Sequence, residues 1–172
     1  IWVNLPAKSK FAAPYFTMFW DDDVPRARPA QGVEVTVVAG ALDNATPPKP
    51  PPDSWAANPD AELAIWLITL EQGAKWTLPP ANGERTARTL YFFVGGKLEM
   101  EGRALTKHAA IEVAADRPVS IAAPDGKVEV LLMQGRPIGE PVAQYGPFVM
   151  NTRAELEQAC SDYPRTQFGG RG

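Results

Sequence analysis

Hydrophobic residues fall along this chain in short segments of strand length. Residues 33–38 form a β-branched run that ends at Ala39-Gly40, and residues 63–70 are almost continuously apolar. An apolar run of that length is typical of a strand that is buried on both faces. Turn residues separate three further predicted strands, at residues 109–113, 119–123 and 128–133. Short strands at such close spacing indicate a barrel or sandwich, so the predicted fold class is all-β.

The middle of the chain contains the pattern of a hairpin. The run 91–94 is followed by Gly95-Gly96 and then by residues 97–100. Glycine accepts the positive φ angles that two-residue turns require, so the two runs are predicted to pair directly through this turn. In the second run Leu98 and Met100 should face the core, because side chains alternate between the two faces of a strand.

One helix is predicted, from Thr152 to about Pro164. The Thr152 hydroxyl can accept a hydrogen bond from the amide three residues on, while Glu155 reaches back, which is the pattern of a capping box. An apolar stripe at helical spacing consists of Leu156, Ala159, Cys160 and Tyr163. That stripe is expected to pack against another part of the protein.

Proline marks the main loop. The chain has 18 prolines in 172 residues, about twice the usual share of roughly 5%. Five of them fall in residues 47–52, where fixed φ angles and missing amide donors favour an extended polyproline stretch. The loop, from about residue 41 to residue 60, is either a stiff strap across the barrel or a docking ligand for the aromatic groove of a partner protein. We prefer the first interpretation.

Composition and charge agree with one packed domain. The hydrophobic share is 45% and the charged share is 22%. Because the formal net charge is −3, binding to nucleic-acid phosphates independent of base sequence is not expected. No apolar run reaches the 18 or so residues that would cross a bilayer, so no membrane partner is expected either. The single cysteine, Cys160, cannot form an internal disulfide. The predicted location is therefore cytoplasmic.

Three segments of the chain resemble the pirin family, whose members are two-barrel cupin proteins. They are the opening residues Trp2 to Lys8, the middle run Arg88 to Phe92, and the closing signature from Gly135 to Thr152 with Tyr163 and the tail 166–170. The resemblance implies a cupin-type double-stranded β-helix, or jelly-roll, barrel with a C-terminal α-helix. Where many relatives have a tryptophan in the tail after Phe168-Gly169-Gly170, this chain ends in Arg171-Gly172.

The resemblance also implies a domain organisation. Residues 1–30 would be an inter-domain linker with an N-terminal strand segment, residues 31–150 the pirin C-terminal cupin barrel, and residues 151–172 the C-terminal helix and tail. Only the second half of a typical pirin is matched, so the family's metal-binding barrel would lie upstream of Ile1. A chain that begins with isoleucine looks like a product of cleavage or of design.

The residues of this chain do not provide the ligands that a cupin metal site needs. A cupin site needs several imidazoles and a carboxylate, usually from a His-x-His pair, a nearby Glu and a later His. This chain has one histidine, His108, and the stretch expected to hold the pair reads Leu78-Pro79-Pro80-Ala81. No catalytic residue and no metal ligand is therefore assigned here, and no cofactor is predicted. The resemblance places iron, or another divalent metal, in the absent N-terminal barrel.

His108 is expected to be an ordinary exposed residue. On the strand that starts there, His108 and Glu112 share the face that should be wet. Cys160 lies in the apolar stripe of the predicted helix and is expected to be buried and inert.

A small-molecule pocket is a further candidate. Trp66, Trp76, Arg88 and Tyr91 could line one, because apolar barrels with aromatic walls and a few polar groups bind planar ligands. Indole rings also bury a large area and often serve simply as core or interface residues. Both interpretations stay open at this point.

The functional prediction follows from the resemblance. The intact parent would be an iron-dependent quercetin 2,3-dioxygenase or a transcriptional co-regulator. This chain by itself is predicted not to be an enzyme, and to act as the structural half that completes the bicupin. Its expected partner is the N-terminal cupin domain of the same parent, with a homodimer or another protein partner as further candidates. The alternative is a stand-alone cupin barrel that binds a small molecule without a redox metal.

Overall fold

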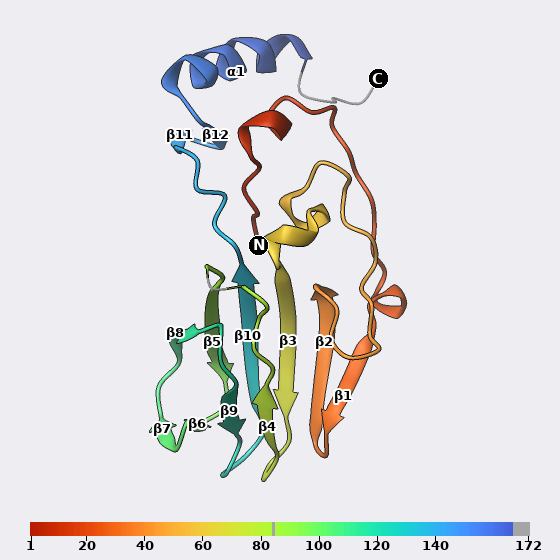
Figure 1. Ribbon diagram of the computed structural model, residues 1–172, viewed down its shortest axis with the longest axis vertical. Helices are drawn as coiled ribbons and strands as arrows, with labels where there is room; N and C mark the ends of the chain where they lie inside the picture. The colour runs from red at the N-terminus through yellow and green to blue at the C-terminus, as the bar shows by residue number, and fades with distance from the viewer. Residues whose placement is uncertain (84, 167–172) are drawn as a thin grey trace. The chain divides into compact units, whose positions relative to one another are not determined.

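The computed structural model describes residues 1–83 and 85–166. Most of the regular structure is β-strand, and one helix follows the last strand (Figure 1). The strands are β1 Arg26–Ala30, β2 Val33–Ala39, β3 Ala64–Leu70, β4 Lys75–Leu78, β5 Ala87–Val94, β6 Leu98–Met100, β7 Arg103–Leu105, β8 Ala109–Ala114, β9 Val119–Ala122, β10 Val128–Gly135, β11 Ala143–Tyr145 and β12 Phe148–Met150. The helix is α1 Arg153–Thr166, and short 3-10 turns occur at Ala7–Ser9, Asp21–Asp23, Trp55–Ala57 and Pro59–Ala61.

Ten of the strands form two antiparallel sheets. The larger sheet has six strands in the order β1-β2-β3-β10-β5-β8, and the smaller has four in the order β4-β9-β6-β7. Figure 1 shows β1 and β8 at opposite ends of the larger sheet. Neighbours in these sheets are mostly distant in sequence, since β10 lies between β3 and β5. The strands predicted from the apolar runs are all present.

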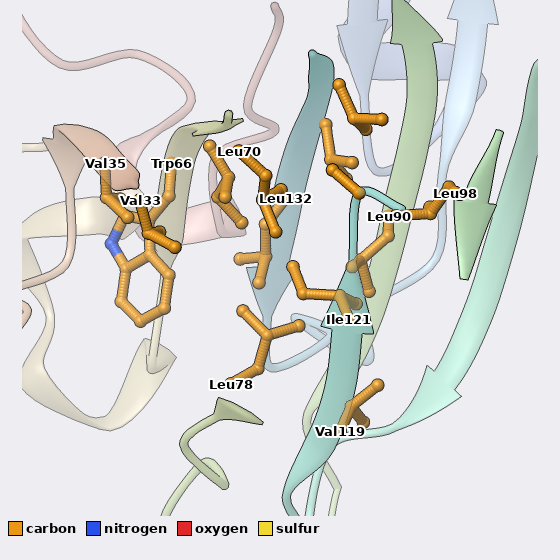
Figure 2. Close-up of a cluster of buried hydrophobic side chains, with 14 of the residues drawn as sticks. Val33, Val35, Trp66, Leu70, Leu78, Leu90, Leu98, Val119, Ile121 and Leu132 are labelled. Carbon is orange, nitrogen blue, oxygen red and sulfur yellow. The ribbon is translucent and has the colours of Figure 1, made fainter. Parts of the chain in front are cut away.

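The core lies between the two sheets. Alternate residues of β2, β3, β5 and β10 are buried, so each strand turns one face to the core and the other toward solvent. Figure 2 shows Leu90 from the larger sheet pointing toward Leu98 and Ile121 from the smaller one. Burial of apolar area of this kind is the main source of folding free energy.

The predicted hairpin at Gly95-Gly96 is wrong. β5 belongs to the larger sheet and β6 to the smaller, so the chain crosses between the sheets here instead of folding back. Gly95 has a φ of 112°, and a Cβ on it would lie 2.7 Å from the Lys127 carbonyl oxygen. Glycine is therefore required by a close crossing next to the start of β10. The buried orientation predicted for Leu98 and Met100 is confirmed.

The two-residue hairpin lies one strand later. β6 and β7 pair with Met100 opposite Arg103, and Glu101-Gly102 form the turn between them. Both turn residues have positive φ angles, 48° and 74°, which is the combination that a type I′ turn requires.

The predicted capping box of the helix is confirmed. The Glu155 amide donates to the Thr152 hydroxyl at 3.2 Å, and the Thr152 amide donates to the Glu155 carboxylate at 2.8 Å. The helix continues through Pro164 to Thr166, slightly beyond the predicted end. A proline in the last turn removes one amide donor but does not stop the final residues from continuing the helix.

The contacts of the chain define two compact units. One contains residues 19–49 and 58–137 and holds the two large sheets. The other contains residues 1–18, 50–57 and the described residues from 138 onward, with β11, β12 and α1. The predicted domain boundaries at residues 30 and 150 remain predictions, and the predicted tail at residues 167–172 lies outside the described residues.

The proline-rich stretch of the loop, residues 47–52, is partly buried. Of the five prolines in this stretch, four are half-buried, and Lys49 and Pro52 are exposed. The strap and the docking ligand both remain predictions for this loop.

Candidate functional site

The most unusual residue of the barrel is Arg88, a charged side chain among buried apolar ones. On β5, Arg88, Leu90 and Phe92 are buried in alternation with more exposed neighbours, so all three point toward the core. Arg88 is only 3% exposed. A buried arginine needs hydrogen-bond acceptors for its guanidinium, because leaving a charge without water or partners is costly.

The acceptors come from β10 and from the segment after β4. Arg88 Nε donates to Gln134 Oε1 at 2.8 Å, and Nη2 donates to the same oxygen. Arg88 Nη1 donates to the Pro79 carbonyl oxygen at 2.8 Å. The sheet register prepares this contact, since Gln134 lies directly opposite Arg88 on the neighbouring strand. Three elements are thus joined at one guanidinium.

A carboxylate completes the cluster. Gln134 Nε2 donates to the Glu62 backbone carbonyl at 2.9 Å, and the Thr86 hydroxyl donates to the Glu62 carboxylate. Burial lowers the pKa of Arg88, and the negative charge of Glu62 raises it in part. The guanidinium nevertheless stays charged near neutral pH, because the ordinary arginine pKa lies far above it. We call Glu62, Pro79, Thr86, Arg88 and Gln134 the Arg88 cluster.

The four predicted pocket residues do not all meet. Trp66 is 5% exposed and its indole Nε1 donates to the Gly40 carbonyl oxygen at 2.8 Å. Trp76 is half-buried and packs against the same core. Tyr91, by contrast, alternates with Arg88 and Leu90 on β5 and so lies on the other face of the sheet. A pocket formed by these residues remains a prediction.

A shallow groove of about 600 Å³ lies elsewhere, beside the turns that follow β1 and β3. Its walls carry both signs of charge. Arg28 and Glu34 form an ion pair at 2.9 Å within it, and Lys127 pairs with Glu129 at 3.0 Å next to it. None of the four predicted pocket residues lines this groove.

The described residues offer no site for a metal like the one that the family resemblance places in the other barrel. Across residues 1–83 and 85–166, no three side chains of His, Cys, Asp or Glu come together in an arrangement that could hold a metal ion. His108 is exposed, as predicted, with its Nε2 3.3 Å from the Gly95 carbonyl oxygen and its ring edge-on to Phe92. Cys160 is half-buried on α1 rather than fully buried. The charged side chain buried in the barrel, Arg88, carries a guanidinium, which donates hydrogen bonds and cannot coordinate a cation.

Comparison with known proteins identifies the family. A family model described as the pirin C-terminal cupin domain matches residues 65–169, which is more than half of the chain. The chain belongs to the pirin family. This pirin domain is also similar in structure to a quercetin 2,3-dioxygenase from Acinetobacter baumannii, with a TM-score of 0.78 and 30% identity over 98% of this chain and 55% of that one. The predicted all-β cupin barrel with a C-terminal helix is therefore confirmed.

Relatives in sequence agree. A Pseudomonas aeruginosa protein named "Putative quercetin 2,3-dioxygenase" is 36% identical over 170 residues, covering 95% of this pirin chain and 56% of that protein. A pirin-like protein of Caulobacter vibrioides is 32% identical over 169 residues, covering 98% of this chain and 57% of that protein. The chain thus spans little more than half the length of these relatives. Of the helices in the described part, none has the length and apolar character needed to cross a membrane.

The sequence alone does not predict most of the Arg88 cluster. Arg88 is one of the predicted pocket residues, but Gln134 and Glu62 are not. A usable signal existed for Gln134, because alternation from Val128, Val130 and Leu132 places it on the buried face of β10. Glu62 precedes its strand, so no periodicity could have indicated that it lies near Arg88.

Proposed function

We propose that this pirin domain is the metal-free, structural half of a bicupin and not an oxygenase by itself. Its interior is built for packing and hydrogen bonding. The single observation that carries this proposal is the guanidinium of Arg88, held inside the barrel by Gln134 and the Pro79 carbonyl oxygen.

The chemistry of that guanidinium argues against iron in this barrel. A divalent cation needs lone pairs that converge on it, from imidazoles or carboxylates. The guanidinium has only donors and a positive charge, so it repels such an ion. The carboxylate of the cluster, Glu62, already accepts from Thr86 and offsets the charge of Arg88.

The partner in this proposal is a second cupin domain of the same parent protein. The relatives named above are almost twice as long as this chain, which leaves room for such a domain. That domain would hold the iron or other divalent metal, and the two would work together in the cytoplasm. The quercetin 2,3-dioxygenase activity named for the relatives would then belong to the whole protein.

Metal analysis of the isolated 172-residue chain tests the proposal. The chain is incubated with Fe²⁺ under argon and desalted, its iron is measured by mass spectrometry, and oxygen uptake is then followed with quercetin. We expect well under one iron per chain and no quercetin-dependent uptake. Stoichiometric iron together with turnover would overturn the proposal.

Thermal unfolding provides an independent readout. A ligand that binds only the folded state raises Tm, so Fe²⁺ should leave Tm of this chain unchanged. A longer relative that holds a metal site serves as the positive control, and its Tm should rise with the same ion. A metal-dependent rise in Tm of the 172-residue chain would contradict the proposal.

A further inference from the structure

The two edges of the six-stranded sheet are built differently. An edge strand exposes unpaired backbone N–H and C=O groups, which can pair with a strand of another molecule. The β1 edge carries the usual protections against this. It contains Pro29, two arginines at positions 26 and 28, and a register irregularity between Ala27 and Ala30. Charges, proline and bulges of this kind prevent a second strand from docking.

The β8 edge lacks most of these protections, because it has no proline, no register irregularity and a single charged residue within the strand. In the sheet, β8 is the terminal strand and pairs with β5 alone, in an uninterrupted register from Ala109 to Ala114. Its sequence, Ala-Ala-Ile-Glu-Val-Ala, has one charged residue and no proline. Its three alanines are exposed, and such small side chains let another backbone approach closely.

We propose that β8 pairs with β8 of a second copy of this chain, antiparallel and about a two-fold axis at Ile111. The pairing would join two six-stranded sheets into one. With a two-fold axis perpendicular to the sheet, a pair of residue i with the partner's residue j implies a pair of j with the partner's i. Residues that pair across an antiparallel ladder have their side chains on the same face, so the axis must pass beside one residue that pairs with its own copy. Two such registers pair five of the six residues of β8, one centred on Ile111 and the other on Glu112.

Charge decides between the two registers. Centring on Glu112 would put the two carboxylates directly opposite each other, which destabilises a pair of strands. Centring on Ile111 puts Glu112 opposite the partner's Ala110 and Val113 opposite the partner's Ala109. Each Glu112 then has the partner's His108 and the partner's Glu112 as diagonal neighbours, so the two carboxylates are no longer directly opposite each other and an imidazole lies at the other diagonal position. The strand is self-complementary in this register.

In the proposed register, substitutions at position 110 test the pairing of β8 with β8 of the second copy. Ala110 is exposed, and its neighbour on β5 is Tyr91, so either charge can be placed there without contact with the core. Ala110→Glu would set a carboxylate opposite the partner's Glu112, whereas Ala110→Lys would set an ammonium there. Each dimer contains two such pairs, each worth roughly 0.2–1 kcal/mol, so the two variants should shift the dimer Kd in opposite directions by about fivefold each.

Sedimentation equilibrium of the 172-residue chain and the two variants measures this. We expect a concentration-dependent dimer that weakens with Ala110→Glu and strengthens with Ala110→Lys, while circular dichroism shows the same fold in all three. Hydrogen exchange should show slower exchange of β8 amides as the concentration rises. A chain that stays monomeric at its highest soluble concentration, or a dimer that both variants leave unchanged or shift in the same direction, would overturn the proposal.

Discussion

At the scale of single residues, Arg88 is the side chain on which most of the interior chemistry depends. Its guanidinium is removed from water and donates to two acceptors on half-buried residues, Gln134 Oε1 and the Pro79 carbonyl oxygen. A buried acceptor that loses its donor costs more than the hydrogen bond itself contributed. The residue therefore matters for stability even though it performs no reaction.

Replacing this arginine should destabilise the domain strongly. Arg88→Met keeps much of the side-chain volume but removes the donor to both acceptors and one positive charge near Glu62. We expect the free energy of unfolding to fall by about 2–4 kcal/mol, measured by urea denaturation. Arg85→Met, at an exposed position in the same segment, is the matched control and should change it by less than about 0.5 kcal/mol. Equal effects of the two substitutions would contradict the role assigned to Arg88.

The sequence predicts Arg88 and Tyr91 as candidates for one pocket, and the structure places them on opposite faces of β5. Positions that differ by an odd number along a strand face opposite sides of a sheet. Strand period alone was therefore enough to separate them. The partner Glu62 could not have been found in this way, because its position depends on how the segment before β3 folds.

At the scale of elements, local sequence identified the strands better than their pairing. The Gly95-Gly96 pair predicts a turn because glycine suits one, but glycine also suits a crossing where two backbones come close. Which of the two occurs depends on β10, more than 30 residues away in the chain. By contrast, the capping box at Thr152 is local, and its geometry matches the prediction.

The close backbone crossing at Gly95 predicts that alanine substitutions at two adjacent glycines have different effects on the free energy of unfolding. Gly95→Ala would place a Cβ 2.7 Å from the Lys127 carbonyl oxygen at a φ of 112°, a conformation and a contact that should cost about 2–3 kcal/mol together. Gly96→Ala is the control, because a Cβ there meets nothing within 4 Å and its φ is not in the left-handed region. It should change the free energy of unfolding by less than about 0.5 kcal/mol. Thermal or urea unfolding of both variants checks this, and similar losses at the two positions would show that the crossing is not as tight as described.

The hydrogen bonds that cap α1 predict that the stability of this helix depends on pH. The hydrogen bond from the Thr152 amide is the largest effect on Glu155 and, with the Asn151 amide, lowers the pKa of that carboxyl from its ordinary value of 4.5. A carboxyl with a lowered pKa in the folded state stabilises the fold above its ordinary pKa, and this contribution is lost as pH falls through the lowered one. Wild type should therefore protect α1 amides better than Glu155→Gln at pH 7, and this difference should vanish at strongly acid pH. Glu157→Gln, on the exposed side of the same helix, should show no such pH-dependent difference in hydrogen exchange.

At the scale of the whole molecule, the sequence predicted the family and fold class but not the grouping of distant segments. The resemblance rested on short motifs spread over the chain, and the family model confirms it. The opening residues and the residues around α1 nevertheless form one compact unit. Such a grouping depends on contacts more than 100 residues apart, which no local pattern records. Glu140 makes one of them, since its Oε2 accepts from the Ala7 amide at 2.6 Å and from Asn151 Nδ2 at 2.8 Å.

The contact between Glu140 and the Ala7 amide predicts that one compact unit can be locally destabilised while the other keeps its stability. Glu140→Ala removes the shared acceptor, so exchange of the Ala7 amide should become about three- to tenfold faster, the equivalent of one or two modest hydrogen bonds. Amides of β10, which belong to the other unit, should keep their exchange rates because local openings involve only part of a protein. Glu140→Gln retains one acceptor oxygen and should give a smaller effect. Faster exchange in β10 as well would mean that the units open together, and an unchanged Ala7 amide would mean that Glu140 does not hold the opening segment in solution.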